Sequence, residues 1–488
     1  MSIKLEIHPS SSSLDLLGPP DPSSAYSLSG YISISLTSPH SLFERRRAVR
    51  IILRSLVITF EGQAELVTHE AGYTSVRLCT ISKELVSKTT VELSNDGHED
   101  EEEPCSWHVM FDLQIPGWLP ASDLYGDSRQ GFSGTQYNLF ATMKFSNVEE
   151  GFTAHAKRRE ITLQRFALPP RSSESASRNT TYYSVTPNEQ ATRPEDNPCL
   201  IPADIVSKIE LLASVPARVN VGEEKIPFVL SVRTSGLPDS QAAKLRVSQL
   251  SLDLQQVERY SSTASAYATR FPLPPEKNQP PNKPLREAHP VHTLYDIGLL
   301  AKPFPFVLED SHSLLPESKR VDIQLNSADN TRKCAKGLHP TKWFTMESQV
   351  PFMRSLSPRK DDALLWTGTP RLRESSQSPF FSVAHVLRVI ITLSYEGTDD
   401  GKSCLTSFLA FSLPLNFVRT RSSHPRSPSP ERSDASAFLP STRLPPSQPY
   451  HVPDLPAYSQ LFYPNGDLRH DDSIPLPLYT PSPRSLLT

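Results

Sequence analysis

The sequence has little cysteine and glycine and no excess of either charge. It contains 5 cysteines and 18 glycines in 488 residues, and its 50 Lys and Arg residues nearly balance 53 Asp and Glu residues. A chain this close to neutral has no global field that attracts nucleic acid or a membrane surface, so any electrostatic contact has to come from a local patch. We therefore expect no nucleic-acid partner.

Metal sites and membrane spans have no signature either. The cysteines are scattered, without a CxxC pair or a histidine at metal-ligand spacing, at Cys79, Cys105, Cys199, Cys334 and Cys404. They predict reduced thiols, with no metal or cofactor. The opening segment MSIKLEIHPSSSS lacks the long apolar region of a signal peptide. No stretch approaches the ~20 uninterrupted apolar residues of a spanning helix. We expect a cytoplasmic protein whose membrane association is peripheral.

Catalytic motifs are also missing. The chain contains no GxSxG, HExxH, P-loop or Gly-rich dinucleotide turn. A β-sandwich glycosidase with paired carboxylates is one alternative, but the acidic residues fall in expected loops without a recognisable flanking pattern. His385 opens a predicted strand, and a structural hydrogen-bonding role is favoured over that of a catalytic base. We expect no enzymatic activity.

What the chain does have is a period-two alternation of apolar and polar residues, which is typical of half-buried strands. In 107–115, apolar residues at every second position alternate with more polar ones. Similar patterns predict strands around 32–36, 56–60, 137–145, 209–215, 226–232, 250–254, 387–395 and 409–417. No comparably long stretch keeps a helical period. The expected fold class is all-β, with two antiparallel, immunoglobulin-like β-sandwich domains.

Composition divides the chain into four parts. One sandwich is expected over 1–166, a Ser/Pro-rich linker over 167–200, and a second sandwich with Pro-rich loop insertions over 201–418. Among these insertions is RFPLPPEKNQPPNKPLREAHP at 270–290, and the sequence leaves open whether it is ordered against the domains. Residues 419–488 hold 14 prolines in 70 positions. We expect them to form a disordered tail, partly of polyproline II character.

The late strands of both expected sandwiches resemble those of the arrestin family. In the first, WHVMFDLQIPGWLP at 107–120 and GTQYNLFATMKF at 134–145 resemble late strands of the arrestin N-terminal domain. In the second, HVLRVIITLSYEG at 385–397 and FLAFSLPLNFV at 408–418 resemble closing strands of the C-terminal domain. Two sandwiches, a linker and a proline-rich tail with tyrosine motifs, in this order, are together similar to a fungal α-arrestin, an arrestin-related trafficking adaptor.

The resemblance implies an adaptor without catalytic activity. Such a protein engages integral-membrane cargo, such as transporters or receptors, and recruits a WW-domain HECT-type ubiquitin ligase for endocytosis and sorting. It would work at the periphery of the plasma membrane and endosomes. The PPxY motif common in these adaptors is missing, and PPSQPY at 445–450 has the wrong spacing. The alternative is a ligase-independent protein-sorting scaffold, similar to the arrestin-like subunit of retromer.

The tail repeats the tetrapeptide Leu-Pro-x-Tyr. A WW domain packs a proline in an aromatic groove and offers a pocket to a tyrosine two residues later. The candidate WW-binding residues are Leu455, Pro456, Tyr458, Leu476, Pro477 and Tyr479. A flexible chain spanning the distance between the two tyrosines has a root-mean-square length on the order of 25 Å, which suits neighbouring WW modules. A single copy arises readily by chance, but two copies predict bivalent docking, with avidity raised by roughly 10²-fold.

A basic cluster precedes one predicted strand. Its residues are Arg45, Arg46, Arg47 and Arg50. Because guanidinium groups bind phosphate in bidentate fashion, the cluster is a candidate contact for a phosphorylated cargo tail or an anionic membrane surface. The alternative is a solvated basic loop.

The start of the tail holds candidate phosphorylation sites. Ser427 and Ser429 each precede a proline, and Ser423 lies between Arg419 and Pro425 at a spacing that phosphoserine-binding adaptors read. Phosphorylation would add about two negative charges at each site. Such dipeptides are also common in disordered tails that are not regulated in this way.

Overall fold

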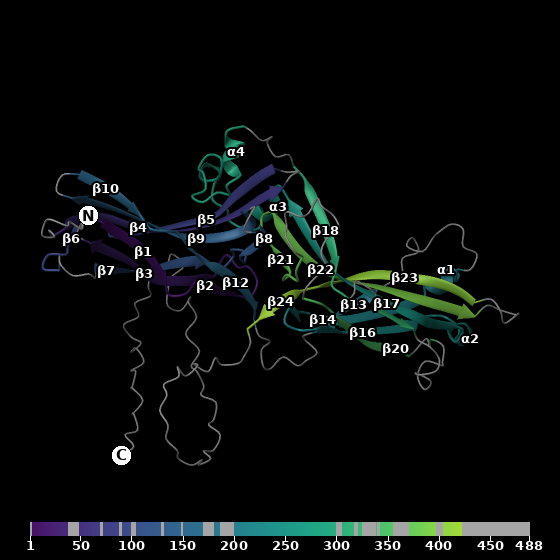
Figure 1. Ribbon diagram of the computed structural model, residues 1–488. Helices are drawn as coiled ribbons and strands as arrows, with labels where there is room; N and C mark the ends of the chain where they lie inside the picture. Colours follow the sequence, from purple (N-terminus) through teal and green to yellow (C-terminus); the bar gives the residue numbers. More distant parts are fainter. Residues whose placement is uncertain are drawn as a thin grey trace, which may run out of the picture. The chain divides into compact units, whose positions relative to one another are not determined.

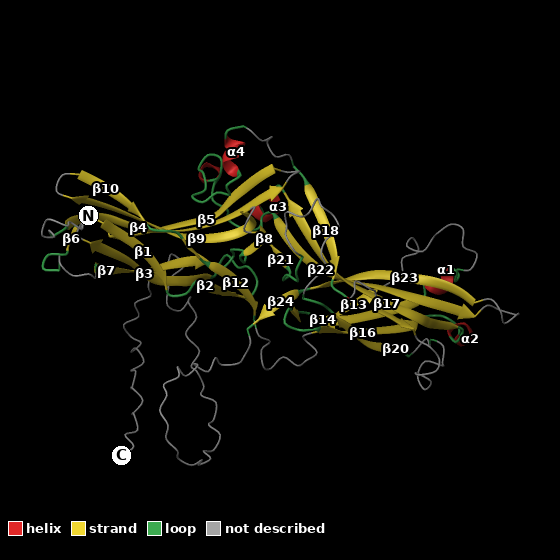
Figure 2. Cartoon of the chain, in the orientation of Figure 1, coloured by secondary structure: helices red, strands yellow, loops and turns green. Residues whose placement is uncertain are grey.

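The computed structural model is an all-β body with a few very short helices (Figure 1, Figure 2). The structure describes residues 2–37, 48–68, 72–86, 90–98, 104–127, 131–147, 150–168, 180–185, 200–298, 305–316, 321–324, 338, 342–354, 370–396 and 404–421. Within these ranges the strands form five sheets, most of whose pairs are antiparallel. None of the helices in the described ranges is long and apolar enough to cross a membrane.

The first half of the chain contributes two antiparallel sheets. One has the strand order β1 (Ser2–Pro9), β3 (Ala25–Thr37), β7 (Cys105–Pro116). The other has the order β10 (Glu150–His155), β9 (Gly131–Asn147), β4 (Arg50–Thr68), β5 (Gly72–Val86). Three short strands extend it, with β6 (Val91–Ser94) on β4, and β8 (Asp123–Asp127) and β11 (Arg159–Glu160) on β9. Apolar side chains from both sheets share one core.

The second half also contributes two antiparallel sheets. The order in one is β13 (Thr180–Val185), β14 (Ile209–Pro216), β16 (Lys225–Thr234), β20 (Phe344–Pro351). In the other it is β18 (Val307–Ser313), β17 (Leu245–Ser261), β22 (Phe381–Glu396), β21 (Ser376–Gln377). There, β19 (Val321–Gln324) also pairs with β17, and β23 (Cys404–Leu415) pairs with β22. These sheets enclose a second core.

A fifth sheet joins the two halves. Its order is β15 (Val219–Asn220), β24 (Phe417–Thr420), β12 (Thr162–Ala167), β2 (Ser13–Leu17), and its three pairs are parallel. The helices are single turns: α1 (Ala203–Val206), α2 (Asp239–Ala242), α3 (Ser265–Ala268), α4 (His292–Asp296) and the 3-10 turn η3 (Glu276–Asn278).

The strands predicted from alternation are confirmed. Each predicted range lies within one observed strand except 409–417, which runs from β23 into β24 across Asn416. In β22, for example, every second residue from Phe381 to Tyr395 is buried. The Thr- and Tyr-rich strand β13 lies within the segment 167–200, which we expected to be a linker, and pairs antiparallel with β14. This segment therefore adds an outer strand to a sheet of the second half.

Strands β17 and β4 contain polar side chains that are almost fully buried. Along β17 the inward positions Leu250, Leu252 and Leu254 are followed by Gln256 and Glu258, and all five have at most 2% of their surface exposed. In β4, one face supplies apolar residues to the first core, while the opposite face presents polar side chains that are also buried. Burial of charged groups costs free energy unless they are paired, so both places require partners.

Candidate functional site

A cluster of charges, two of them buried, one half-buried and one exposed, lies where segments of the two halves meet. We call Asp123, Glu258, Arg371 and Arg373 the charged cluster. Asp123 begins β8, Glu258 lies near the end of β17, and the two arginines come from the segment that precedes β21. Three segments that are distant in the sequence therefore meet through ion pairs.

Arg373 is the centre of the charged cluster. Its Nη1 pairs with Asp123 Oδ1, and its Nε lies 3.5 Å from Glu258 Oε1. The guanidinium carbon lies 3.7 Å from the ring centroid of Tyr125, a favourable cation–π contact. Burial lowers the pKa of Arg373, but Tyr125, Asp123 and Glu258 outweigh this effect and raise its pKa overall. The guanidinium therefore stays charged at every physiological pH.

The Gln256 side chain fixes the geometry around Glu258. Its Nε2 donates hydrogen bonds to Glu258 Oε1 at 2.8 Å and to the main-chain oxygen of Arg371 at 2.9 Å. Its Oε1 accepts a hydrogen bond from the main-chain nitrogen of Arg373 at 2.9 Å. The other Glu258 oxygen accepts a hydrogen bond from the hydroxyl of Tyr260. Both carboxylate oxygens are thus held in place.

The charges of the cluster balance. Arg371 Nη2 lies 3.4 Å from the same Asp123 oxygen that Arg373 contacts, so two guanidinium groups face the two carboxylates of Asp123 and Glu258. Arg373 and Glu258 are both buried, so removing one of them leaves the charge of the other uncompensated, which typically costs about 3–5 kcal/mol. The arrangement is therefore suited to holding the three segments in one geometry.

His385 extends this network toward the second core. Its Nε2 lies 3.3 Å from Gln256 Oε1, and its Nδ1 lies 2.9 Å from Ser375 Oγ. The imidazole stacks on Phe417, with ring centroids 4.1 Å apart. Burial lowers the pKa of His385 to about 3. The imidazole is consequently neutral near pH 7 and serves as a hydrogen-bonding group.

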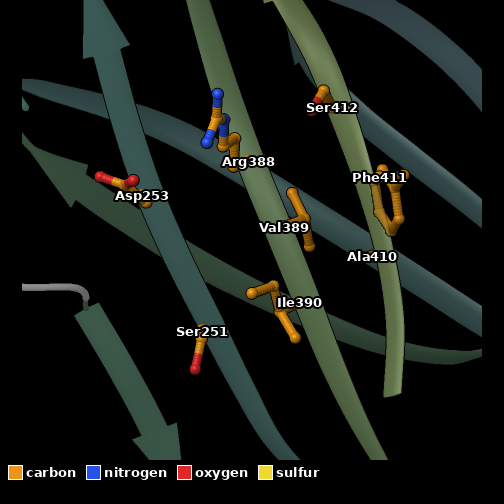
Figure 3. A pocket seen from close by; sticks show the side chains of 8 residues that line it. All are labelled: Ser251, Asp253, Arg388, Val389, Ile390, Ala410, Phe411 and Ser412. Carbon is orange, nitrogen blue, oxygen red and sulfur yellow. The ribbon is translucent and has the colours of Figure 1, made fainter. Parts of the chain in front are cut away.

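A depression of about 350 Å³ lies on the sheet formed by β17, β22 and β23 (Figure 3). It is lined by Ser251, Asp253, Arg388, Val389, Ile390, Ala410, Phe411 and Ser412. Asp253 and Arg388 lie opposite each other in the pairing of β17 with β22. The lining thus offers one carboxylate and one guanidinium, whereas a glycosidase site needs two carboxylates. Among the described residues, no group of three or more His, Cys, Asp or Glu side chains is arranged to hold a metal ion.

Most of the residues singled out from the sequence lie outside the described ranges. These are Arg45, Arg46, Arg47, Ser423, Ser427, Ser429, Leu455, Pro456, Tyr458, Leu476, Pro477 and Tyr479. Arg50 is described: it begins β4, and its guanidinium forms ion pairs with Glu92 and Asp96. The charge of Arg50 is therefore already balanced by neighbouring acidic residues.

The charged cluster was not among the candidate sites predicted from the sequence. One feature of the sequence could have indicated it: the inward positions of 250–254 are apolar, and the next two inward positions are the polar residues Gln256 and Glu258. No known family model matches the chain, and a search of curated proteins finds no match either. The resemblance to arrestins thus rests on the segments named above and on their order in the chain.

Proposed function

We propose that this protein is an arrestin-like adaptor that links integral-membrane cargo, such as a transporter or a receptor, to a WW-domain HECT-type ubiquitin ligase for endocytosis and sorting. The repeated Leu-Pro-x-Tyr motif, with Tyr458 and Tyr479, carries this proposal. Two β cores joined by the charged cluster support it, because they provide a body for the binding of cargo, and the motifs follow this body in the sequence.

The adaptor acts by proximity, without catalysis of its own. The body binds the cargo, the tail binds the ligase, and the ligase then works at a raised effective concentration near lysines of the cargo. Such a protein works in the cytoplasm, at the periphery of the plasma membrane and endosomes. The charged cluster contributes by keeping the two halves in one geometry while both partners are bound.

Calorimetric titration of the full chain with a tandem WW fragment of a HECT-type ligase tests this function. We expect micromolar or tighter binding, weakened by Tyr458→Ala or Tyr479→Ala alone and lost in the double variant, because each tyrosine fills one WW pocket. Tyr450→Ala is the matched control. It lies in the proline-rich PPSQPY segment with the wrong spacing and should bind like the unaltered chain.

The same variants separate this function from the alternative one. A chain that does not bind the WW fragment, or cargo ubiquitination that persists in the double tyrosine variant, would favour the ligase-independent sorting scaffold. Cargo ubiquitination that falls in parallel with WW binding would support the ligase adaptor.

A further inference from the structure

A segment of the second half lies on the outer face of a sheet of the first half. We call residues 262–298, which follow β17 and contain α3, η3 and α4, the strap. Near its start, Phe271 stacks on Trp118 with ring centroids 5.8 Å apart and an interplanar angle of 12°. Near its end, α4 lies beside β5, where His292 contacts the ring of Tyr73 at 5.2 Å (Figure 1). Between these contacts the strap crosses the polar face of β4.

Three side chains of β4 each bind one main-chain group of the strap. Glu61 Oε1 accepts a hydrogen bond from the Arg286 nitrogen at 3.1 Å. Gln63 Nε2 donates one to the main-chain oxygen of Glu287 at 2.6 Å. Glu65 Oε1 accepts one from the His289 nitrogen at 2.8 Å. Since residues at every second position of a strand share a face, the three side chains form one row. This row binds main-chain groups of residues 286–289, where the backbone of the strap makes a turn at 286 and 287.

Arg77 of β5 completes this row. Its guanidinium donates hydrogen bonds to the main-chain oxygens of Asn278, Lys283 and Pro284, the last at 2.6 Å. Its Nε lies 3.4 Å from Glu61 Oε2. We call Glu61, Gln63, Glu65 and Arg77 the recognition strip; each has at most 2% of its surface exposed.

The main chain of Arg77 is also bound by the strap. Gln279 Oε1 accepts a hydrogen bond from the Arg77 nitrogen at 2.8 Å, and Gln279 Nε2 donates one to the Arg77 oxygen at 2.9 Å. Because β5 ends its sheet in the strand order β10-β9-β4-β5, these main-chain groups point away from β4. An open strand edge of this kind is a place where another chain can add itself. Here a glutamine side chain occupies it.

The recognition strip therefore binds backbone more than side chains. Arg286 is the charged side chain of the strap that pairs with the recognition strip. Its Nε lies 3.8 Å from Glu61 Oε2, and its guanidinium carbon lies 5.4 Å from the ring centroid of Phe140. A ligand of the strip thus needs a backbone that follows the turns of the strap, free amides at the positions of Arg286 and His289, and an arginine side chain at the position of Arg286. Prolines favour binding of such a backbone because they restrict its conformational freedom before binding.

We propose that the recognition strip is a peptide-binding site, that the strap occupies it as an intramolecular ligand, and that a proline-flanked, arginine-containing segment of another protein, which follows the same turns, takes the place of the strap. The proposal does not depend on ligase recruitment by the tail. Because the strap is part of the same chain, its effective concentration at the recognition strip is about a millimolar. An external segment therefore competes poorly for the strip until the contacts of the strap are weakened.

The test uses the full chain and a fluorescent peptide with the sequence of residues 274–291, PPEKNQPPNKPLREAHPV. In one variant of the chain, Gln279→Ala and Arg286→Ala together weaken the strap and leave the recognition strip intact. By fluorescence anisotropy we expect this variant to bind the peptide at least tenfold more tightly than the unaltered chain does. Lys283→Ala in the chain is the matched control, because that side chain is exposed and only its main-chain oxygen is used.

Changes in the peptide test the role of its backbone without altering the protein. N-methylation of the peptide amides at Arg286 and His289 removes the donors that Glu61 and Glu65 bind, and should weaken binding at least tenfold. Circular dichroism and cooperative thermal unfolding first show that the variant is folded. If it is not, Gln279→Ala alone takes its place.

Either of two results would overturn the proposal. One is an affinity for the peptide that differs less than twofold between the unaltered chain and the folded strap variant. The other is an N-methylated peptide that binds as tightly as its parent. A tenfold gain in the strap variant that N-methylation abolishes would establish the site.

Discussion

Arg77 and Arg373 are both buried arginines, yet their charges are balanced by different kinds of group. Arg373 is held mainly by side chains, with Asp123 and Glu258 as its ionic partners and the ring of Tyr125 against its guanidinium. One main-chain oxygen, that of Leu124, lies 3.4 Å from its Nη2. Arg77 has one ionic partner, Glu61, and otherwise binds three main-chain oxygens of the strap. The charged cluster thus depends on the identity of each residue, whereas the recognition strip depends on the path of a backbone.

This difference determines how each region responds to substitution of its residues and whether its bound segment can be replaced by another. A charged cluster built from side chains loses its balance when any single member is replaced, so it fixes one arrangement of three segments. A strip that binds main-chain groups accepts many sequences, provided that they follow the same path and carry an arginine at the position of Arg286. The first arrangement is suited to a permanent joint between the halves, and the second to a place where one segment can be exchanged for another.

The largest effect is expected from Arg77→Met. This change leaves Glu61 without its close partner in a buried place and leaves three main-chain oxygens without donors, so the free energy of unfolding should fall by about 3–5 kcal/mol. Urea denaturation of the full chain measures it. The control is Arg158→Met, which removes an exposed ion pair with Glu287 at the edge of the strap and should cost less than about 1 kcal/mol. Equal losses in the two variants would show that the strap contributes little to stability.

Local patterning predicted the strands well, because burial of one face is a property that each strand carries in its own sequence. Followed past Leu254, the same pattern reaches Gln256 and Glu258 at inward positions, which marks a buried polar site without naming its partners. Asp123 and Arg373 come from segments far away in the chain. Only the fold brings them together.

The strap was beyond the reach of sequence patterning for a different reason. Glu61, Gln63 and Glu65 alternate with core residues and look like the solvent-facing side of a strand. The groups they bind are main-chain amides and carbonyls, which almost every residue has, so no residue pattern marks 276–289 as their partner. A proline-rich segment was accordingly predicted as a loop, while its order against the first half stayed open.

A second, smaller effect concerns the pH dependence of stability at His385, which is linked to the charged cluster through Gln256. The pKa of His385 is about 3 in the folded chain and about 6.5 when unfolded, so below pH 6.5 the unfolded state binds the additional proton. Stability from this residue is complete above pH 6.5 and falls as the pH drops toward 3, by about 2 kcal/mol between pH 6.5 and 5. Urea unfolding at both pH values should show this loss in the unaltered chain and its absence in His385→Gln. The same pH dependence in both chains would mean that other groups cause it.

The smallest expected effect is a coupling free energy between two substitutions. It distinguishes the charged cluster from the recognition strip most clearly. In the charged cluster, Asp123→Ala and Arg373→Ala each remove the partner of the other, so a double-mutant cycle of unfolding free energies should give a coupling on the order of 1 kcal/mol. At the strap, Arg77→Ala and Lys283→Ala should be additive within about 0.5 kcal/mol, because alanine keeps the main-chain oxygen that Arg77 binds.

A large coupling between Arg77 and Lys283 would mean that the strap is recognised through its side chains. An external segment would then have to match its sequence, and exchange at the recognition strip would be far more selective than a backbone contact allows. Additivity there, beside a coupling of about 1 kcal/mol between Asp123 and Arg373, would instead identify one joint that is fixed by its residues. The other would be open to segments of different sequence that follow the path of the strap and carry its arginine.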